Sequence, residues 1–225
     1  MFDRLNLLIG QEDLDKIKLK KVCVIGLGGV GGYALEILIR SGIENITIVD
    51  FDTIDISNLN RQIITNQENV DSKKVLEAKK RMMLINPNAN IECLDIKLDQ
   101  DNLEDLLKEK FDYIIDACDT LVVKFLLMKY RSVYNYKLIS SMGTAKKLDP
   151  TKLEITTLDK TSYDPLAKKL RNLIKTNHVK GKFYVVSSTE IAKDTGKVLG
   201  SFAAVPAVSG IYLASFVIND IIKNK

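Results

Sequence analysis

Cysteine and histidine are scarce in this chain of 225 residues. The three cysteines, Cys23, Cys93 and Cys118, are far apart and each lies in an apolar stretch, and His178 is the only histidine. Because no two cysteines are spaced as Cys-x-x-Cys, the sequence argues against a zinc knuckle and against a framework of disulfides. Isolated cysteines in apolar stretches fit a reducing compartment, and we expect a cytoplasmic protein.

Other common features are missing too. Residues 1–4 (MFDR) lack the pattern of a signal peptide, and the chain has neither an internal repeat nor a low-complexity segment. Apolar residues make up 46% of the chain and charged residues 28%, which is the composition of an ordinary globular protein. At this length the chain can bury a sizeable core within one domain, with or without a small extension.

Short apolar stretches alternate with longer stretches of helical periodicity in the first part of the chain. Apolar strands separated by helices indicate parallel strands that are buried on both faces. This order predicts an α/β fold with a Rossmann-like, doubly wound, mainly parallel sheet and right-handed crossovers. The predicted strands are residues 22–26, 46–49, 91–94, 113–115 and 138–140, and the predicted helices are residues 30–41, 72–85, 101–107 and 122–134.

The pattern changes in the last third of the chain. Strands are predicted at residues 153–158 and 183–186, with a basic amphipathic helix at residues 163–177 between them. These elements would form a mixed C-terminal extension. We expect residues 1–145 to form the core and residues 146–225 to be an extension of the same domain.

The C-terminal residues 202–222 are apolar over a length that can cross a membrane. However, Pro206, Gly210 and several serines interrupt this stretch. An interrupted apolar stretch is more typical of a buried helix or of a helix in a dimer interface. We therefore expect no stable membrane insertion.

A glycine-rich loop, residues 26–31 (GLGGVG), follows the first predicted strand directly and opens a helix. In such a loop Gly26 permits a tight turn, Gly28 lets a phosphate approach the backbone, and Gly31 allows close helix–strand packing. Asp50 lies 19 positions after Gly31, at the end of the second strand, where a carboxylate accepts hydrogen bonds from ribose hydroxyls. The combination predicts a nucleotide site, which NAD would fit, and the alternative is a loop kept only for packing.

Two cations and a further acid favour a triphosphate over NAD. Arg61 lies eleven residues after Asp50, Lys74 lies another thirteen residues on, and both follow strand ends on the edge that carries the glycine loop. Two cations there would offset the charge of a triphosphate, and Asp119, after the fourth strand, would be the expected ligand of Mg²⁺. Taken singly, Lys74 could be an exposed helix lysine and Asp119 the N-cap of the next helix.

These residues together resemble the ATP-binding core of the ubiquitin-activating-enzyme-like adenylating superfamily. The resemblance rests on residues 26–31, residues 50–52 (DFD), residues 57–62 (SNLNRQ), Lys74 and residues 116–119 (DACD). The superfamily includes the bacterial activators of sulfur-carrier proteins in molybdopterin and thiamin synthesis. The resemblance covers about the first 145 residues and implies that a carboxylate is adenylated with ATP and Mg²⁺. It implies nucleotide contacts by Gly26, Gly28, Gly29, Gly31, Asp50, Asp52, Asn58, Arg61, Gln62 and Lys74, with Arg61, Lys74, Asp119 and Arg4 as catalytic residues.

Asp119 and Arg4 would act together with a metal ion and with a second protein chain, respectively. The resemblance makes Asp119 the ligand of Mg²⁺ and leaves a monovalent-cation requirement open. Arg4, in residues 4–10 (RLNLLIG), is similar to the arginine that members of the superfamily donate across a dimer interface to the partner's ATP. The resemblance therefore implies a homodimer.

The second half of the chain selects a branch of the superfamily. Residues 143–151 (GTAKKLDPT), 164–171 (DPLAKKLR) and 186–190 (VSSTE) resemble the tRNA threonylcarbamoyladenosine dehydratases. Sulfur-carrier activators usually carry two Cys-x-x-Cys pairs, and many members carry a later cysteine for thioester transfer, whereas this chain has no cysteine after Cys118. A thioester relay needs a thiolate at that point, so covalent transfer is disfavoured.

The implied reaction needs no nucleophile from the protein. The carboxylate of threonylcarbamoyladenosine in tRNA would attack the α-phosphate of ATP and release pyrophosphate, and the acyl adenylate would then close intramolecularly to a cyclic product and AMP. The enzyme would supply positioning and charge stabilisation. A sulfur-transfer partner of the cysteine-desulfurase type is left open by the resemblance.

Basic residues are concentrated in residues 146–182, which hold ten basic and four acidic side chains, a net charge of +6. Such a segment can bind the phosphates of tRNA, and Lys168, Lys169 and Arg171 are our candidates for this contact. A solvated lysine-rich face is the alternative, and His178 is better explained as a solvated loop residue than as an RNA contact.

Other functions remain to be weighed against the dehydratase hypothesis. They are an activator of a small sulfur-carrier or ubiquitin-like protein, a nucleotide sensor without turnover, and an NAD oxidoreductase. The missing cysteines count against the first. Arg61, Lys74 and Asp119 together argue against a sensor that has lost catalysis.

Overall fold

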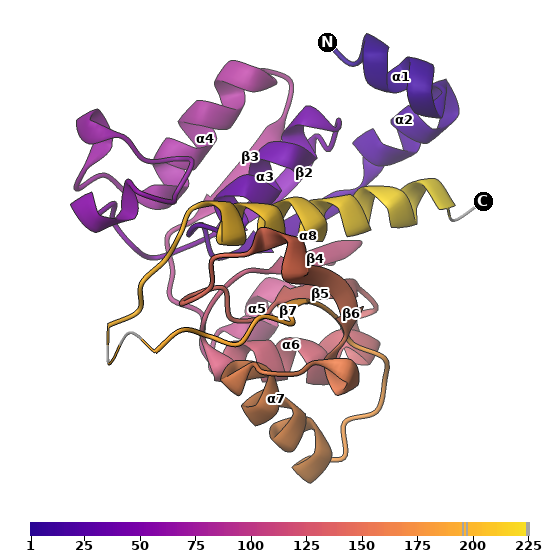
Figure 1. Ribbon diagram of the computed structural model, residues 1–225. Coiled ribbons are helices and arrows are strands. Elements are labelled where there is room, and N and C mark those ends of the chain that lie inside the picture. Colours follow the sequence, from indigo (N-terminus) through magenta and orange to yellow (C-terminus); the bar gives the residue numbers. More distant parts are fainter. Residues whose placement is uncertain (195, 197, 224–225) are drawn as a thin grey trace.

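A twisted sheet runs through the middle of the molecule and helices cover both of its faces (Figure 1). The structure is a computed structural model that describes residues 1–194, 196 and 198–223. Within these residues the sheet has seven strands in the order β3-β2-β1-β4-β5-β7-β6. The strands are β1 (Lys21–Ile25), β2 (Asn45–Val49), β3 (Asn90–Leu94), β4 (Tyr113–Asp116), β5 (Lys137–Ser141), β6 (Leu153–Thr157) and β7 (Tyr184–Ser188).

Neighbouring strands are parallel throughout the sheet except for β6, which pairs antiparallel with β7 at one edge. The predicted Rossmann-like, mainly parallel fold with a mixed C-terminal part is thereby confirmed. The strand order reverses between β1 and β4, and in open α/β sheets ligands bind at the carboxyl ends of the strands beside such a switch point. The topology alone thus places a binding crevice next to the glycine loop.

Eight α-helices and four short 3₁₀-helices complete the described chain. The first two α-helices were not predicted, because α1 buries no residue and α2 buries only Leu14 and Ile17. Such short amphipathic stretches carry little periodic signal. The helices are α1 (Asp3–Ile9), α2 (Gln11–Leu19), α3 (Gly31–Arg40), α4 (Lys74–Ile85), α5 (Leu103–Leu107), α6 (Leu121–Tyr134), α7 (Pro165–Thr176) and α8 (Ala204–Lys223), with η1 (Ile56–Asn58), η2 (Gln67–Asn69), η3 (Pro150–Lys152) and η4 (Leu158–Lys160).

Two apolar cores lie on opposite faces of the sheet. Along β1, Val22 and Val24 pack into the core that contains α3, α4 and α8, whereas Cys23 and Ile25 pack into the core that contains α5, α6 and α7. All four side chains are at most 3% exposed. Burial on both faces explains why the parallel strands appear in the sequence as continuous apolar stretches instead of alternating ones.

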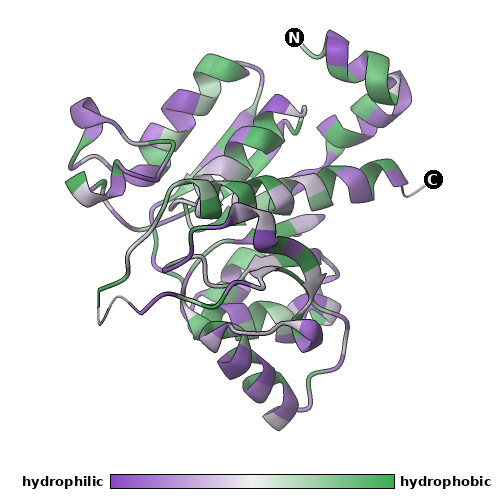
Figure 2. Ribbon diagram, in the orientation of Figure 1, coloured by the Kyte–Doolittle hydropathy of each residue, from purple (hydrophilic) through white to green (hydrophobic). Residues whose placement is uncertain are grey.

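Helix α8 packs lengthwise against α3 and crosses the sheet beside it (Figure 1). Its length and hydropathy would suffice for a membrane span, the one such helix in the described chain, and Figure 2 shows that it is rich in apolar residues. One face of α8 is nevertheless buried within the protein, at Val205, Pro206, Ser209, Gly210, Leu213, Ala214, Val217 and Ile221. In this structure α8 is therefore a helix of the apolar core.

The second half of the chain adds to the same sheet. Strand β7 pairs with β5, and β6 pairs with β7, so that the strands of the second half continue the sheet formed by the first half. Helix α7 lies at the far end of the molecule from α1, and its surface is mostly polar (Figures 1 and 2). The loops after β1, β2, β4 and β5 all lie at the carboxyl ends of these parallel strands. The candidate site lies at this end of the sheet.

Candidate active site

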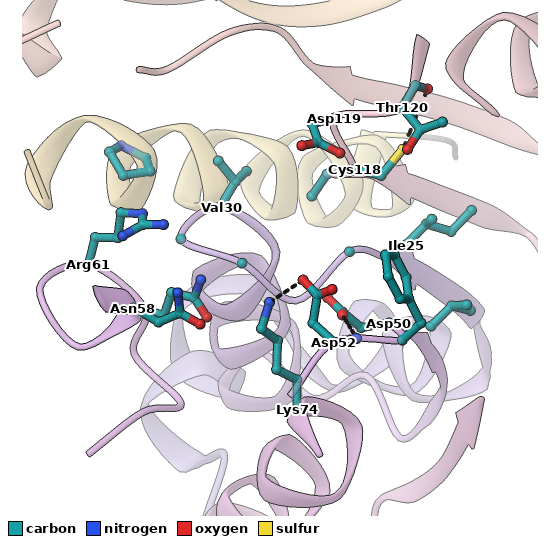
Figure 3. Close-up of a pocket in the computed structure, with 18 of the residues that line it drawn as sticks. Ile25, Val30, Asp50, Asp52, Asn58, Arg61, Lys74, Cys118, Asp119 and Thr120 are labelled. Atoms are coloured by element: carbon teal, nitrogen blue, oxygen red, sulfur yellow. Dashed lines mark hydrogen bonds and ion pairs between the residues drawn. The ribbon is translucent and has the colours of Figure 1, made fainter. Parts of the chain in front are cut away.

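A pocket of about 560 Å³ lies at the carboxyl ends of β1, β2 and β4 (Figure 3). This volume lies within the usual range of small-molecule and cofactor sites. Most of the residues predicted to bind the nucleotide line it, and so does the predicted magnesium ligand. These lining residues are Gly26, Gly28, Gly29, Asp50, Asp52, Asn58, Arg61, Gln62, Lys74 and Asp119.

Two glycines of the loop are required by close packing. Gly26 has a φ of +88°, and a Cβ built there would lie 2.9 Å from the carbonyl oxygen of Ala117. A Cβ on Gly31 would lie 1.7 Å from the carbonyl oxygen of Gly26, so the loop can fold against β4 only with glycine at both positions. Gly31 lies beneath the pocket in this packing role, outside its lining.

The start of α3 is open toward a ligand. Val30 is the N-cap residue, and no side chain caps the helix. Amides without an intrahelical acceptor lie at the positive end of the helix dipole, which suits a phosphate, and of these first amides the N–H of Gly32 is already bonded to the carbonyl oxygen of Gly28 at 3.1 Å. At Gly28, apart from its neighbours in sequence, the only atom of the described residues within 4 Å of a built Cβ is Nε2 of Gln62, at 3.9 Å. The geometry therefore leaves room for a phosphate against the backbone.

Asp50 ties the end of β2 to the glycine loop. Its Oδ2 accepts a hydrogen bond from the backbone N–H of Leu27 at 2.6 Å, and its Oδ1 accepts one from the N–H of Asp52 at 2.9 Å. Each carboxylate oxygen has a second lone pair, so the group can still accept from a ribose hydroxyl. The ribose contact predicted for Asp50 stays a prediction, and the structure adds its role in shaping the loop.

Lys74 is the first residue of α4, and its ammonium lies in the pocket. The side chain is only 5% exposed, and its Nζ lies 2.7 Å from Oδ2 of Asp52, whose side chain is 47% exposed (Figure 3). The alternative that Lys74 is an exposed helix lysine is therefore wrong. A buried ammonium with one half-exposed partner is well placed to exchange that partner for a phosphate oxygen.

The segment after β2 presents Arg61 and two amide side chains. The guanidinium of Arg61 is held by its own loop, because Nη1 donates to the carbonyl oxygen of Ser57 and to Oδ1 of Asn60, both at 2.8 Å. Asn58 lines the pocket while its Oδ1 accepts from the N–H of Asp55 at 3.2 Å in a capping box. Oε1 of Gln62 is buried without a hydrogen-bond donor in the described chain, as expected where a ligand supplies the donor.

Asp119 lies across the pocket from Lys74 and Arg61 (Figure 3). The alternative that it caps the following helix is wrong, because the N-cap of α6 is Thr120. Among the described residues no group of three or more histidine, cysteine or acidic side chains could hold a metal. Mg²⁺ is commonly held by one or two carboxylates together with substrate phosphates. Asp119 thus fits a magnesium site that is completed by the nucleotide and water.

A buried ion pair behind the pocket was not predicted. Lys124 and Asp116 are both 0% exposed, Nζ of Lys124 lies 3.0 Å from Oδ1 of Asp116, and it also donates to the carbonyl oxygen of Ser141 at 2.8 Å. The pair joins the ends of β4 and β5 to α6 and so positions Ala117–Asp119 at the pocket. The only signal in the sequence is a lysine in the otherwise apolar stretch of residues 121–128 (LVVKFLLM).

Cys118 lines the pocket but is not an activated thiol. Burial, followed by the charge of Asp116, raises the pKa of Cys118 well above its ordinary value. Burial likewise raises the pKa of Cys23. Because the thiolate is the nucleophilic form, neither cysteine is prepared for thioester chemistry. This agrees with the sequence argument against covalent transfer.

The remaining predicted residues lie outside the pocket. Arg4 is exposed on α1, and Lys168 and Lys169 are exposed on α7. Arg171 is engaged within the protein, since its Nη1 donates to the carbonyl oxygen and the hydroxyl of Thr161. The structure thus leaves Lys168 and Lys169 accessible to phosphate and gives Arg171 an anchoring role, while the tRNA contacts stay predictions.

Residues that follow β5 and β7 complete the pocket wall. Thr144 and Ala145 follow β5, and Leu199, Ser201 and Pro206 come from the connection between β7 and α8 and from the start of that helix. The sequence singled out residues 143–151 only through the resemblance, and no role was assigned to Thr144 or Ala145. Their place in the wall depends on which loops meet at the edge of the sheet.

Comparison with known proteins shows to which family the chain belongs. The model of the ThiF family matches residues 2–222. The chain belongs to the ThiF family. Within it, the chain is 36% identical to the tRNA threonylcarbamoyladenosine dehydratase of Bacillus subtilis over 99% of this chain and 95% of that protein. It is 29% identical to the enzyme of the same name from Haemophilus influenzae, over 100% of this chain and 94% of that protein.

A solved structure of such a relative is also similar to this chain. The crystal structure of the Escherichia coli tRNA N6-threonylcarbamoyladenosine dehydratase in complex with ATP superposes with a TM-score of 0.93 at 32% identity, covering 98% of this chain and 93% of that chain. The molybdopterin-synthase adenylyltransferase of Haemophilus influenzae is 37% identical, but over only 51% of this chain. Similarity to this sulfur-carrier activator is thus confined to about half the chain, whereas similarity to the dehydratases covers nearly all of it.

Proposed function

We propose that this ThiF-family protein is an ATP-dependent tRNA threonylcarbamoyladenosine dehydratase. The observation that carries the proposal is the extent of similarity, because two bacterial relatives with this name match over 94–95% of their own length and over 99–100% of this chain. The similarity to a molybdopterin-synthase adenylyltransferase covers only 51% of this chain, and Thr144 and Ala145, in a stretch that resembles the dehydratases, line the pocket.

In the proposed reaction the pocket binds ATP with its phosphates against the glycine loop. Lys74 and Arg61 would offset the charge of the triphosphate, and Asp50 would accept from the ribose. Asp119 would hold Mg²⁺, which supplies further charge neutralisation at the phosphates. Preorganised cations in a half-closed pocket stabilise the charge that develops as pyrophosphate leaves.

Bond changes in this reaction occur between the two substrates. A carboxylate oxygen of the threonylcarbamoyl group attacks the α-phosphorus, and the bond from this phosphorus to pyrophosphate breaks. The carbamoyl group then closes on the activated carboxyl carbon and AMP leaves, so that the modified nucleoside loses one water overall. Since the attacking group is tethered to the electrophile, the protein need only position the two. The inert thiol of Cys118 is consistent with this scheme.

We propose that tRNA docks on the basic face of residues 146–182, with Lys168 and Lys169 on α7 as phosphate contacts. We further propose a homodimer in which Arg4 enters the partner's pocket, because Arg4 is exposed and lies outside the pocket of its own chain. A cytoplasmic location follows from the proposed tRNA substrate. A sulfur-transfer partner and a monovalent cation rest on the resemblance alone.

Pyrophosphate release tests the proposal most directly. The purified protein is incubated with ATP and Mg²⁺, with tRNA that carries threonylcarbamoyladenosine or with the same tRNA lacking the modification. We expect release only with the modified tRNA, together with a nucleoside lighter by one water in mass analysis. Release that depends instead on a small carrier protein ending in Gly-Gly would support the adenylyltransferase alternative and contradict the proposal.

A further inference from the structure

The three stretches that resemble the dehydratases lie far apart in the sequence but meet in the structure. The meeting point is the loop after β5, residues 143–149, which we call the β5 loop. Asp164 reaches it from the start of α7: its Oδ2 accepts from the N–H of Gly143 at 2.8 Å, and its Oδ1 accepts from the N–H of Ala167 at 2.9 Å. One carboxylate therefore holds both the first residue of the β5 loop and the first turn of α7.

Lys147 completes this contact from within the β5 loop. Its Nζ donates to the carbonyl oxygen of Gly143 at 2.9 Å and lies 3.8 Å from Oδ2 of Asp164. The two side chains are 3% and 1% exposed, and burial lowers the pKa of the Lys147 ammonium. Burying a charged pair is costly unless its geometry is well satisfied. The buried Lys147–Asp164 pair therefore restricts the conformations that the β5 loop can adopt.

Glu190, which follows β7, holds the other end of the β5 loop. Its carboxylate accepts from the N–H of Leu148 at 3.0 Å and from the N–H of Asp149 at 2.9 Å. Between the two anchored ends, Thr144 and Ala145 line the pocket. Two carboxylates from other segments therefore hold the ends of the β5 loop, while the backbone of Lys146 forms hydrogen bonds with Lys193 and Gly200.

We propose that Asp164 is a positioning residue that couples the basic helix α7 to the nucleotide pocket, so that tRNA bound on α7 sets the position of Thr144 and Ala145. The inference rests on the proposed function. Lys168 and Lys169 lie one turn into the helix that Asp164 caps. A helical turn is rigid, and a shift of the helix start is passed through the Gly143 N–H and the Lys147 ammonium to the loop.

Capping alone does not explain this arrangement. An N-cap needs one side-chain oxygen, which Ala167 occupies, and asparagine serves as well as aspartate in that role. The second oxygen of Asp164 is directed to Gly143 and Lys147 on another segment. The negative charge is therefore needed for the β5 loop and not for the helix.

The test compares Asp164→Asn and Lys147→Met with Asp105→Asn, an exposed acid of α5 that lies outside residues 146–182 and outside the pocket lining. For each full-length variant, kcat and the KM values for ATP and for modified tRNA are measured, together with the melting temperature. We expect Asp164→Asn to lower kcat by about 10- to 100-fold, because small misplacements of groups at a reacting centre have effects of this size. The KM for tRNA should stay within about twofold, since the phosphate contacts remain.

Lys147→Met should likewise lower kcat, and Asp105→Asn should match the unsubstituted protein. An unchanged kcat in Asp164→Asn, or a loss that merely follows the fraction of unfolded protein, would overturn the inference. If Asp164→Asn does not fold, Lys147→Met decides the question on the same readouts. If the unsubstituted protein itself releases no pyrophosphate in response to modified tRNA, the proposed function fails and the inference fails with it. If the unsubstituted protein is active and only the expected effect of the substitutions is missing, the inference fails and the proposed function stands.

Discussion

Replacement of Lys74 by methionine should abolish most activity while leaving the fold intact. The ammonium of Lys74 lines the pocket, is 5% exposed and has one acidic partner, Asp52, at 2.7 Å. Removing one preorganised electrostatic donor from an active site typically raises the activation barrier by about 2.7–4 kcal/mol, which lowers kcat by about 10²- to 10³-fold. We expect Lys74→Met to fall in this range for pyrophosphate release.

The effect on stability should be small because the acidic partner stays hydrated. After the substitution Asp52 is left without its ammonium, but its side chain is 47% exposed and remains solvated. The methionine retains most of the apolar contacts of the lysine stem. Partly exposed ion pairs contribute about 0–1 kcal/mol, so the free energy of unfolding should change by no more than that.

The assay pairs ATP binding by calorimetry with pyrophosphate release, and Lys73→Met is the matched control. Lys73 precedes Lys74, does not line the pocket, and pairs with Asp95 at 3.1 Å, where both side chains are 42% exposed. We expect near-normal binding and turnover in the control. If Lys74→Met binds ATP and turns over within about twofold of the unsubstituted protein, or if Lys73→Met is equally impaired, then a phosphate-binding role for Lys74 is refuted.

The same geometry leads to three further predictions. Asp119→Asn should raise the Mg²⁺ concentration needed for half-maximal pyrophosphate release and lower the maximal rate, because it removes the proposed charged ligand; a magnesium titration at saturating ATP measures both. The double substitution of Lys168 and Lys169 by glutamate should weaken tRNA binding and lower the slope of log affinity against log salt concentration by about one for each tRNA phosphate that is no longer neutralised. Lys124→Met should lower the free energy of unfolding by about 3–5 kcal/mol in a urea titration, because it leaves Asp116 buried and unpaired.

Controls and contrary outcomes differ among these three. An unchanged magnesium dependence in Asp119→Asn would remove that residue from the metal site. For the basic helix, Lys108→Glu at the end of α5 is the comparison, because Lys108 is exposed and outside residues 146–182; an equal decrease of tRNA affinity there would contradict a specific docking face. For the buried pair, a change below about 1 kcal/mol in Lys124→Met would mean that water enters the site and solvates Asp116.

Local features of the sequence predicted most of the sheet and ten of the residues that line the pocket. The glycine loop directly follows β1, and Asp50 directly follows β2. Residues this close to the end of a strand must lie at that end of the sheet, so their positions could be predicted. Apolar stretches buried on both faces marked β1, β2 and β4 for the same reason. By contrast, α1 and α2 bury too few side chains to have a periodic signal.

Other parts of the site could not be predicted because they depend on contacts between distant residues. The partner of Lys124 is eight residues away across the end of a strand, and the ammonium of Lys74 lies against Asp52, which is 22 positions away in the segment after β2. Arg171 lies in the basic segment like its neighbours, but its guanidinium turns inward to Thr161. Net charge marks a segment as basic and does not say which cations remain exposed.

The sequence by itself determined the fold class, the place of the candidate nucleotide site and the branch of the superfamily that this chain resembles. Each of these depends on residue types at short, fixed spacings, or on the absence of a cysteine after Cys118. Only the tertiary structure decided that residues 143–149, Asp164 and Glu190 form one cluster beside the pocket. Their contacts join residues separated by up to 42 positions, and such contacts exist only once parallel strands have brought their loops to the same end of the sheet.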